Sequence, residues 1–354
     1  MAEYLSFTAA DLVQRSHENE LKNLDPGNRK FNFFFSRNSL VSKYLTNRKK
    51  AGNCTILWGG RIVIGPQWNG TLISFSLYLL TSLVVVRDLL IPSFVDDISS
   101  FTSKIMPVCI GVLLLFNFLM MMLTSFTNPG IVPRFETEGL PPGADPRSVD
   151  STTGFLVPRY LLLNGVCIRQ KFCRTCRVYR PPRSNHCTVC DNCVLRHDHH
   201  CLALGTCVGL GNYRWFLLLC GGMCVLLPLV FWIARAQLFA IYYQDPSSPP
   251  QTLEFMKEQC VLLIVAVLSV VVSGAFLLLF IYHYFITSHN LTTNEHLKKY
   301  YKVNPFDFGQ SVNFKHVLCF PQELLPVEET LDVRASYKEL ASTNSECVSD
   351  FYDY

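Results

Sequence analysis

The amino-acid sequence predicts a membrane α-helical fold, with four transmembrane helices and a cytosolic cysteine-rich loop domain between the second and the third. Hydrophobic residues make up 49% of the 354 residues and charged residues only 16%, a smaller charged fraction than soluble proteins usually have. Between Cys173 and Cys207 lie seven of the fifteen cysteines and four of the nine histidines. Thiolates and imidazoles at this density are typical ligands of tetrahedral zinc, so the loop is predicted to be zinc-stabilised.

Four apolar stretches contain no Asp, Glu, Lys or Arg and are 19 to 27 residues long. At 1.5 Å per residue this length suffices to cross a hydrocarbon core of ~30 Å. Buried helices of a soluble protein would need a large polar shell, which this composition does not supply. Within the stretches, His283 and Asn117 are expected to make local backbone or interhelical hydrogen bonds rather than to line a cavity. The predicted spans are Trp68–Val86, Ile105–Phe126, Trp215–Ala234 and Cys260–Ile286.

Lysine and arginine are distributed unevenly among the segments that flank these spans. Ten precede the first span, eleven lie between the second and the third and six follow the fourth, whereas the two short loops carry two each. Because positively charged loops stay on the cytosolic side, both termini and the cysteine-rich loop are predicted to face the cytosol. Many unpaired cysteines with C-x-x-C spacing also favour a reducing compartment. The net charge of +4 is dispersed along the chain and predicts no nucleic-acid partner.

These features divide the chain into six segments. The N-terminal arm is either a solvated segment or a surface for anionic headgroups. Within it, Gly59–Pro66 is predicted to be a short turn-bounded strand or a re-entrant piece that lies against the membrane. An amphipathic stretch, His296 to Phe314, is expected to lie on the membrane face and to pack back on the cysteine-rich loop. The segments are 1–67 (cytosolic arm), 68–126 (transmembrane helices 1 and 2), 127–214 (cysteine-rich zinc domain, with a linker at 134–158), 215–286 (transmembrane helices 3 and 4), 287–320 (cytosolic amphipathic segment) and 321–354 (disordered acidic tail).

The cysteine-rich loop offers ten candidate ligands, enough for two four-ligand zinc sites, which could be sequential or interleaved. The interleaved partition gives both sites one spacing, C-x-x-C, a spacer, His, six residues, Cys. Two filled Cys₃His sites have no open position, so both zinc ions are expected to be structural and to fold a loop with little apolar core of its own. The predicted sites are Cys173, Cys176, His186 and Cys193, and Cys187, Cys190, His200 and Cys207.

This partition leaves Asp198, His199 and Cys201 unligated within four residues. A thiol beside an imidazole that a carboxylate can orient is the nucleophile, base and orienter arrangement of covalent catalysis. Zinc on His200 would fix the backbone that carries these groups. Cys201 could instead be a spare or alternative ligand, and His197 is predicted to be an exposed loop histidine.

The position of this loop beside two spans narrows the class of substrate that the cysteine can meet. A nucleophilic cysteine at the membrane surface can meet a thioester whose long acyl chain is buried among the helices, because each buried methylene contributes about 0.8 kcal/mol. Four arginines recur every three residues and could either contact the phosphates of coenzyme A or form a solvated face. They are Arg174, Arg177, Arg180 and Arg183.

Several motifs occur together along the chain. They are C-x-x-C at Cys173–Cys176, RPPRSNHCxxCxxCV at Arg180–Val194, DHHC at Asp198–Cys201, CVGxxNYRxF at Cys207–Phe216, Asn128-Pro129-Gly130, TTxE at Thr292–Glu295, and Asn313. In these motifs the chain resembles the DHHC family of protein S-acyltransferases. That family has Asp-Pro-Gly where this chain has Asn128-Pro129-Gly130, and a C-terminal family motif has an asparagine where Asn313 falls. The resemblance covers residues from about 55 to 320. The N-terminal arm, with GGRIVIGP, is similar to the Ras-acylating branch.

The resemblance implies a protein S-palmitoyltransferase. Cys201 would accept palmitate from palmitoyl-CoA as an acyl-enzyme, with His199 as base and Asp198 orienting it, and would pass it to a cysteine of a protein substrate. The zinc assignment of the family agrees with the interleaved partition, and Thr293 would lie near Asp198. The expected partners are membrane lipid, acyl-CoA and cytosol-facing proteins with membrane-proximal cysteines. An accessory subunit is a further candidate. The expected location is the Golgi or another endomembrane, with the plasma membrane as the alternative.

The chain departs from the family pattern directly after Cys201. Leu202-Ala203 replaces the usual Pro-Trp, and Thr206 replaces an asparagine. Loss of a large aromatic side chain beside the nucleophile removes a surface that could order the acyl thioester. The departure implies an altered acyl preference or weaker activity.

Two other functions are compatible with the sequence. A catalytically inactive relative would act as a membrane scaffold, and it would take no hydroxylamine-sensitive label from palmitoyl-CoA. A zinc-finger interaction protein or ubiquitin ligase of the membrane would use Cys201 as a ligand. In that case Cys201→Ser would lower the zinc content below two ions per chain.

Overall fold

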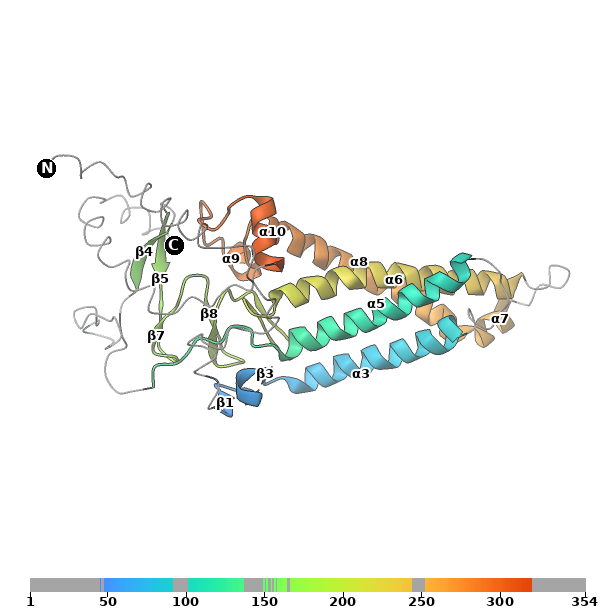
Figure 1. Ribbon diagram of the computed structural model, residues 1–354, viewed down its shortest axis with the longest axis horizontal. Coiled ribbons are helices and arrows are strands. Elements are labelled where there is room, and N and C mark those ends of the chain that lie inside the picture. Colours follow the sequence, from blue (N-terminus) through green and yellow to red (C-terminus); the bar gives the residue numbers. More distant parts are fainter. Residues whose placement is uncertain are drawn as a thin grey trace, which may run out of the picture.

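Four long helices run side by side in the computed structural model, with small β-hairpins at one end and the short helix α7 at the other (Figure 1). The predicted tail, most of the predicted linker and the first part of the N-terminal arm lie outside the described residues. The structure describes residues 48–91, 101–136, 158–163, 166–243 and 252–319, with positions 45, 149, 151, 154 and 156.

Each long helix is long and apolar enough to cross a membrane, which confirms the four predicted spans. The third helix begins two residues before the predicted span and continues to Tyr242. This difference arises because the apolar pattern marks the hydrocarbon-spanning part, whereas backbone hydrogen bonds continue the helix beyond it. The helices are α3 (Trp68–Val85), continued by a π-helical turn η2 (Val86–Leu90), α5 (Phe101–Phe126), α6 (Tyr213–Tyr242) and α8 (Cys260–Ser288), with the seven-residue α7 (Thr252–Glu258) before α8.

Helix α6 lies centrally and packs against both α5 and α8. Its buried residues include Phe216, Cys220 and Leu226. Large apolar side chains on the other helices point outward, and Leu83 and Leu278 are 66% and 72% exposed. So many exposed apolar side chains are costly in water, and they suit helices surrounded by lipid.

The strands described between α5 and α6 form two-stranded antiparallel hairpins. Its buried core contains six cysteines together with few aliphatic side chains, among them Ile131 and Val194. Such a small apolar core is consistent with a domain that needs metal to fold. The hairpins pair β4 (Arg159–Leu163) with β5 (Val166–Gln170), β6 (Phe172–Cys173) with β7 (Val178–Tyr179), β8 (Asn185–Cys187) with β9 (Asn192–Val194), and β10 (His199–Cys201) with β11 (Thr206–Val208).

The described end of the N-terminal arm folds against these hairpins. It forms a three-stranded antiparallel sheet of β1 (Lys50–Ala51), β2 (Cys54–Leu57) and β3 (Ile62–Ile64), with a 3₁₀ turn, η1 (Trp58–Gly60), between the last two strands. The strand predicted within Gly59–Pro66 is therefore present as β3. Alternate residues of β2 are buried and join the core of the metal-binding hairpins.

The segment after α8 also packs on the hairpins, as predicted. It contains two short helices, α9 (Thr293–Leu297) and α10 (Gln310–Leu318), instead of one continuous amphipathic stretch. Helix α9 begins with a capping box between Thr292 and Glu295, which satisfies backbone donors at its start. Asn313 is fully buried, and its amide donates to the Ser288 carbonyl oxygen at 2.8 Å, which holds α10 against the end of α8.

Candidate active site and metal groups

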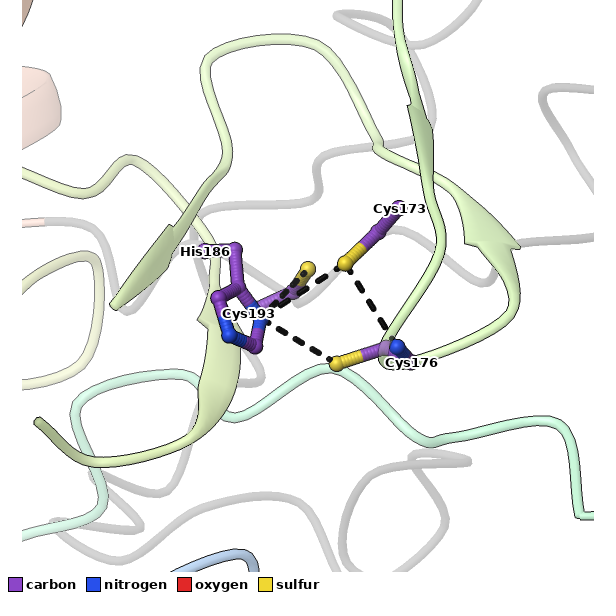
Figure 2. Close-up of side chains that lie close together, drawn as sticks. All are labelled: Cys173, Cys176, His186 and Cys193. Atoms are coloured by element: carbon purple, nitrogen blue, oxygen red, sulfur yellow. Dashed lines mark hydrogen bonds between the residues drawn. The ribbon is translucent and has the colours of Figure 1, made fainter. Parts of the chain in front are cut away.

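The first metal group comprises Cys173, Cys176, His186 and Cys193, whose side chains converge as predicted (Figure 2). The Nδ1 atom of His186 lies 3.5 Å from the Sγ atoms of Cys173 and Cys176 and 3.8 Å from that of Cys193. Bond lengths of about 2.3 Å for Zn–S and about 2.0 Å for Zn–N imply a ligand-to-ligand distance of roughly 3.5 Å in a tetrahedron. The donor set and its spacing therefore fit tetrahedral zinc.

The second metal group comprises Cys187, Cys190, His200 and Cys207, also as predicted. His200 Nδ1 lies 3.3 to 3.6 Å from the three sulfur atoms. Its other ring nitrogen, Nε2, donates to Oε1 of Gln67 at 2.8 Å, which fixes the ring orientation and leaves Nδ1 for a metal. Local sequence patterns give no sign of this role of Gln67, because the contact joins residues 133 positions apart.

Strand alternation explains how neighbouring residues serve different roles. In β10 and β11, His200 is directly opposite Cys207, and both belong to the second metal group. Successive side chains of a strand point to opposite faces, so His199 and Cys201 point away from that group. In β8, the same alternation sends His186 to the first group and Cys187 to the second. The two groups are thereby interleaved, and Cys201 belongs to neither among the described residues.

Asp198, His199 and Thr293 form a hydrogen-bonded row beside Cys201. His199 Nδ1 donates to Asp198 Oδ2 at 2.7 Å. The Thr293 hydroxyl donates to the same oxygen at 2.7 Å, and its backbone N–H donates to Oδ1 at 2.8 Å. The Asp198 carboxylate is thus buried and held from both sides. Since His199 Nδ1 faces Asp198, its Nε2 is left for Cys201, whose thiol interacts electrostatically with the ring.

The electrostatics of this row favour a proton on the imidazole. Burial lowers the pKa of His199, but the hydrogen bonds to Asp198 and Cys201 outweigh it and raise the pKa to about 9. Burial raises the pKa of the Cys201 thiol, but the hydrogen bond and charge of His199 outweigh it, and the pKa is lowered. The geometry therefore supports a thiolate beside an imidazolium.

The ring of His199 rests on the ends of the transmembrane helices. Its centroid lies 5.3 Å from that of Phe216 on α6 and 6.1 Å from that of His283 on α8. The Tyr213 hydroxyl and His283 Nδ1 are 3.0 Å apart, which confirms the predicted interhelical hydrogen bond. Asn117 donates to the Leu113 carbonyl oxygen at 2.9 Å, so the local bond predicted for it is also confirmed.

The hairpin that carries Cys201 is pressed against the start of α3. The Thr71 hydroxyl donates to the Leu204 carbonyl oxygen at 2.9 Å. Gly70 has no side chain where the Leu202 carbonyl oxygen approaches, and an added Cβ would collide with that oxygen. The apolar side chain of Leu202 itself is 65% exposed. These contacts place the nucleophile candidate at the point where the hairpins meet the helices.

The four arginines that were considered as coenzyme A contacts, Arg174, Arg177, Arg180 and Arg183, do not form one surface. The Arg183 side chain is only 10% exposed, and its guanidinium donates to both carboxylate oxygens of Glu295 at 2.9 Å. Arg180 donates to Asn185 at 3.0 Å. Arg174 is exposed, whereas Arg177 is partly buried. A coenzyme A contact by these residues stays a prediction, and the ion pair of Arg183 weighs against it for that residue.

We expect Arg183→Met to destabilise the protein by about 3–5 kcal/mol, because Glu295 would keep a buried charge without its partner. Chemical unfolding of the protein in detergent measures the change. The double variant Arg183→Met with Glu295→Gln should recover part of the loss, since neither charge is then left unpaired. An Arg183→Met protein as stable as the native chain would contradict the structural role of this ion pair.

The prediction that His197 is exposed is wrong. His197 is buried, and its Nε2 lies 3.7 Å from the Cys207 sulfur. The turn that leads into β10 packs its side chain against the second metal group, which spacing along the chain does not show.

Two asparagines organise the entry and exit of the hairpin region. The Asn128 side chain accepts the N–H groups of Gly130 and Ile131, each at 3.0 Å, and so makes the turn expected from its sequence. Asn212 donates to the carbonyl oxygens of Thr124 and Cys207, which ties the end of α5 and the second metal group to the start of α6. The second role was missed, because it depends on the meeting of three distant segments.

We expect Thr293→Val to slow the acylation predicted for Cys201 by about tenfold or more, because a hydrogen bond to a charged group contributes about 1.5–3 kcal/mol. The rate of incorporation of labelled acyl groups measures this effect. Thr293→Ser keeps the hydroxyl and should retain most of the rate. Equal rates in the native and Thr293→Val proteins would show that the contact with Asp198 plays no part in acylation.

Comparison with known proteins agrees with this site. A family model described as DHHC palmitoyltransferase matches residues 166–300. "Probable protein S-acyltransferase 5" of Arabidopsis thaliana is 32% identical over 283 residues, which cover 76% of this chain and 57% of the plant protein. "Palmitoyltransferase ZDHHC18-B" of Danio rerio is 32% identical, with 74% and 69% of the two chains covered. "Palmitoyltransferase ZDHHC9" of Homo sapiens is 32% identical, with 68% and 70% covered.

The fold and the site define a multi-pass membrane protein in which two interleaved Cys/His metal groups support an Asp-His-His-Cys hairpin. The chain belongs to the DHHC palmitoyltransferase family. It is accordingly an acyltransferase enzyme that acts on protein cysteines.

Proposed function

We propose that this protein transfers a long-chain acyl group from acyl-CoA to a cysteine of a protein substrate through an acyl-enzyme on Cys201. The Cys201 thiolate attacks the thioester carbonyl carbon, and the bond from that carbon to the coenzyme A sulfur breaks. His199 gives its proton to the departing thiolate. It then accepts the proton of the substrate thiol, whose sulfur attacks the Cys201 thioester and releases Cys201.

The observation that carries the proposal is the row from Thr293 through Asp198 and His199 to Cys201. A base must lie within hydrogen-bond reach of the proton that it moves, and a third group should fix its tautomer. Asp198 meets the second condition, since it holds His199 Nδ1. The carboxylate is itself fixed by Thr293, so little reorganisation accompanies proton transfer.

We propose zinc for both metal groups, with a structural role. Each group is Cys₃His with ligand spacings that fit a tetrahedron, and zinc in such a closed site has no open position for substrate. Bound zinc would hold His200 and Cys207 across β10 and β11, so that His199 and Cys201 keep their orientation on the opposite face.

The position of Cys201 beside the transmembrane helices supports the proposal that the acyl chain of the substrate lies in the membrane. Its half-buried side chain packs against the helical core that includes Trp215, Leu219 and Cys220. The substrates proposed on this basis are cytosol-facing proteins with cysteines close to the membrane. We further propose that both termini and the hairpin region face the cytosol, and that the protein resides in the Golgi or another endomembrane. An altered acyl preference from Leu202-Ala203 stays a prediction.

The proposal is tested by incubating the purified protein in detergent with labelled acyl-CoA of several chain lengths. We expect a hydroxylamine-sensitive label on the native chain and at least a 100-fold slower reaction in His199→Ala, since general acid–base catalysis contributes about 10²–10⁴-fold. His199→Ala should retain its metal, because the ring points away from both metal groups. An unlabelled native chain would support the scaffold interpretation. Metal loss in His199→Ala would overturn the division between ligands and catalytic groups.

A further inference from the structure

A buried aromatic ring lies between two histidines where α6 begins and α8 ends. The ring is Phe216 of α6, and it meets the ring of His199 edge-on, with the centroids 5.3 Å apart and an interplanar angle of 68°. It meets His283 of α8 in the same manner, at 4.9 Å and 75°. His283 is only 2% exposed, and its centroid lies 6.1 Å from that of His199. The proposed function gives His199 a role but leaves His283 without one.

The orientation of the His199 ring needs more than one fixed point. Rotation of a histidine ring about its Cβ–Cγ bond has broad energy minima, and Asp198 holds only the Nδ1 atom, at 2.7 Å. The His199 side chain is still 29% exposed, so part of the ring lies open. Packing against Phe216 supplies the second point of contact. How well Nε2 stays directed at Cys201 therefore depends on how firmly Phe216 is held.

The neighbour of Phe216 on α8 is held by a hydrogen bond between two helices. The Tyr213 hydroxyl of α6 lies 3.0 Å from His283 Nδ1 and 3.1 Å from Thr287 Oγ1. All three side chains are buried. Buried polar groups stay hydrogen-bonded, because separation would leave them unpaired where little water reaches them. Tyr213 thus fixes the His283 ring, and this ring closes the space on one side of Phe216.

We propose that His283 is a positioning residue for acylation. Bonded to Tyr213, it keeps the Phe216 ring against His199, so that the Nε2 atom of His199 stays directed at Cys201. It acts through Phe216 and moves no proton itself. The inference rests on the proposed function, in which His199 carries the proton.

Two variants remove the bond between Tyr213 and His283 and keep both rings aromatic. They are Tyr213→Phe and His283→Phe, studied in the full chain in detergent with labelled palmitoyl-CoA. We expect each to lower the maximal rate of acylation of Cys201 by about tenfold, the effect of one lost hydrogen bond. The half-saturating concentration of palmitoyl-CoA should not change, because the bond orients His199 and does not hold the substrate. The double variant should be no slower than the slower single variant, since both remove the same bond.

A third variant tests whether the effect passes through Phe216. Phe216→Leu removes the ring between the two histidines, so Tyr213→Phe should have no further effect when it is added to Phe216→Leu. Ser269→Ala is the matched control. Ser269 is a buried polar residue of the same helix as His283, its hydroxyl donates to the Ala266 carbonyl oxygen at 2.8 Å, and its replacement should leave the rate unchanged.

Alkylation of Cys201 by iodoacetamide gives a reading that needs no acyl-CoA. The thiolate is the reactive form of a cysteine, and a His199 ring that is poorly oriented supports it less well. We expect slower alkylation of the peptide that contains Cys201 in Tyr213→Phe and His283→Phe, measured by mass spectrometry, and no change at the exposed Cys260.

Three results would overturn the inference. The first is a maximal rate within about twofold of the native rate in Tyr213→Phe. The second is a higher half-saturating concentration at an unchanged maximal rate, which would make His283 part of the substrate site. The third is an equal effect of Tyr213→Phe with and without Phe216. If His283→Phe loses metal or its native elution profile, Tyr213→Phe decides alone. A native chain that takes no label would contradict the proposed function, whereas unchanged alkylation in both variants would contradict the role of His283.

Discussion

Cys201→Ser is expected to abolish the hydroxylamine-sensitive label from acyl-CoA while the protein keeps both metal ions. Serine is nearly isosteric with cysteine, but its hydroxyl stays protonated where the thiol of Cys201 ionises beside His199. We expect the rate of acyl-enzyme formation to fall at least 1,000-fold, by analogy with the loss of other covalent nucleophiles. Mass spectrometry of the intact protein after incubation with acyl-CoA measures the acylated fraction.

The control for this change is Cys319→Ser. Cys319 is exposed, lies just after α10 and belongs neither to the catalytic row nor to a metal group, so its replacement should leave the acylated fraction of Cys201 unchanged. Metal analysis on the same samples tests the other half of the expectation. A label that survives in Cys201→Ser would place the nucleophile elsewhere. Loss of one metal ion from that variant would favour the interpretation of Cys201 as a ligand.

Cys207→Ala is expected to lose the metal of the second group and most of the folded hairpin region. Structural zinc contributes about 10–16 kcal/mol of apparent binding free energy in small metal-dependent domains, and a group of three ligands would bind the ion more weakly and leave its fourth position open to water. Because Cys207 is opposite His200 in the pairing of β10 with β11, the same loss should disorder Cys201. We expect one metal ion per chain at most, a large fall in folded yield and no acylation, as measured by metal analysis and size-exclusion chromatography.

Cys260→Ala provides the comparison, since Cys260 is an exposed cysteine at the start of α8, far from both metal groups. It should keep two metal ions and a native elution profile. A Cys207→Ala protein that folds, binds two ions and is acylated would show that the second group does not support the site. His186→Ala makes the corresponding test of the first group.

Much of this organisation could be predicted because it depends on short-range patterns. Span length and the absence of charge follow from local composition, and the four helices lie where those patterns placed them. The two metal groups were predicted from a spacing repeated within about 20 residues, because a tetrahedral ion restricts which neighbours can close on it. Alternation in β10 then separates His199 and Cys201 from His200.

Contacts between distant segments could not be derived in this way. His197 is buried, and Asn53 of the N-terminal arm donates to the Cys190 carbonyl oxygen. Both contacts depend on how separate hairpins pack. The same holds for the ion pair between Arg183 and Glu295, 112 residues apart in the chain. Local patterns of charge and hydrophobicity determine which faces can be buried, whereas the partner of each buried polar group depends on the whole packing.

By itself, the sequence determined the membrane class, and it predicted the grouping of the Cys and His ligands and the row of Asp198, His199 and Cys201, because length, charge and ligand spacing are properties of contiguous residues. Only the tertiary structure decided what surrounds them. It set Gln67 against His200, Arg183 against Glu295 and Asn53 against Cys190, because a buried polar atom must find a partner wherever the folded chain supplies one.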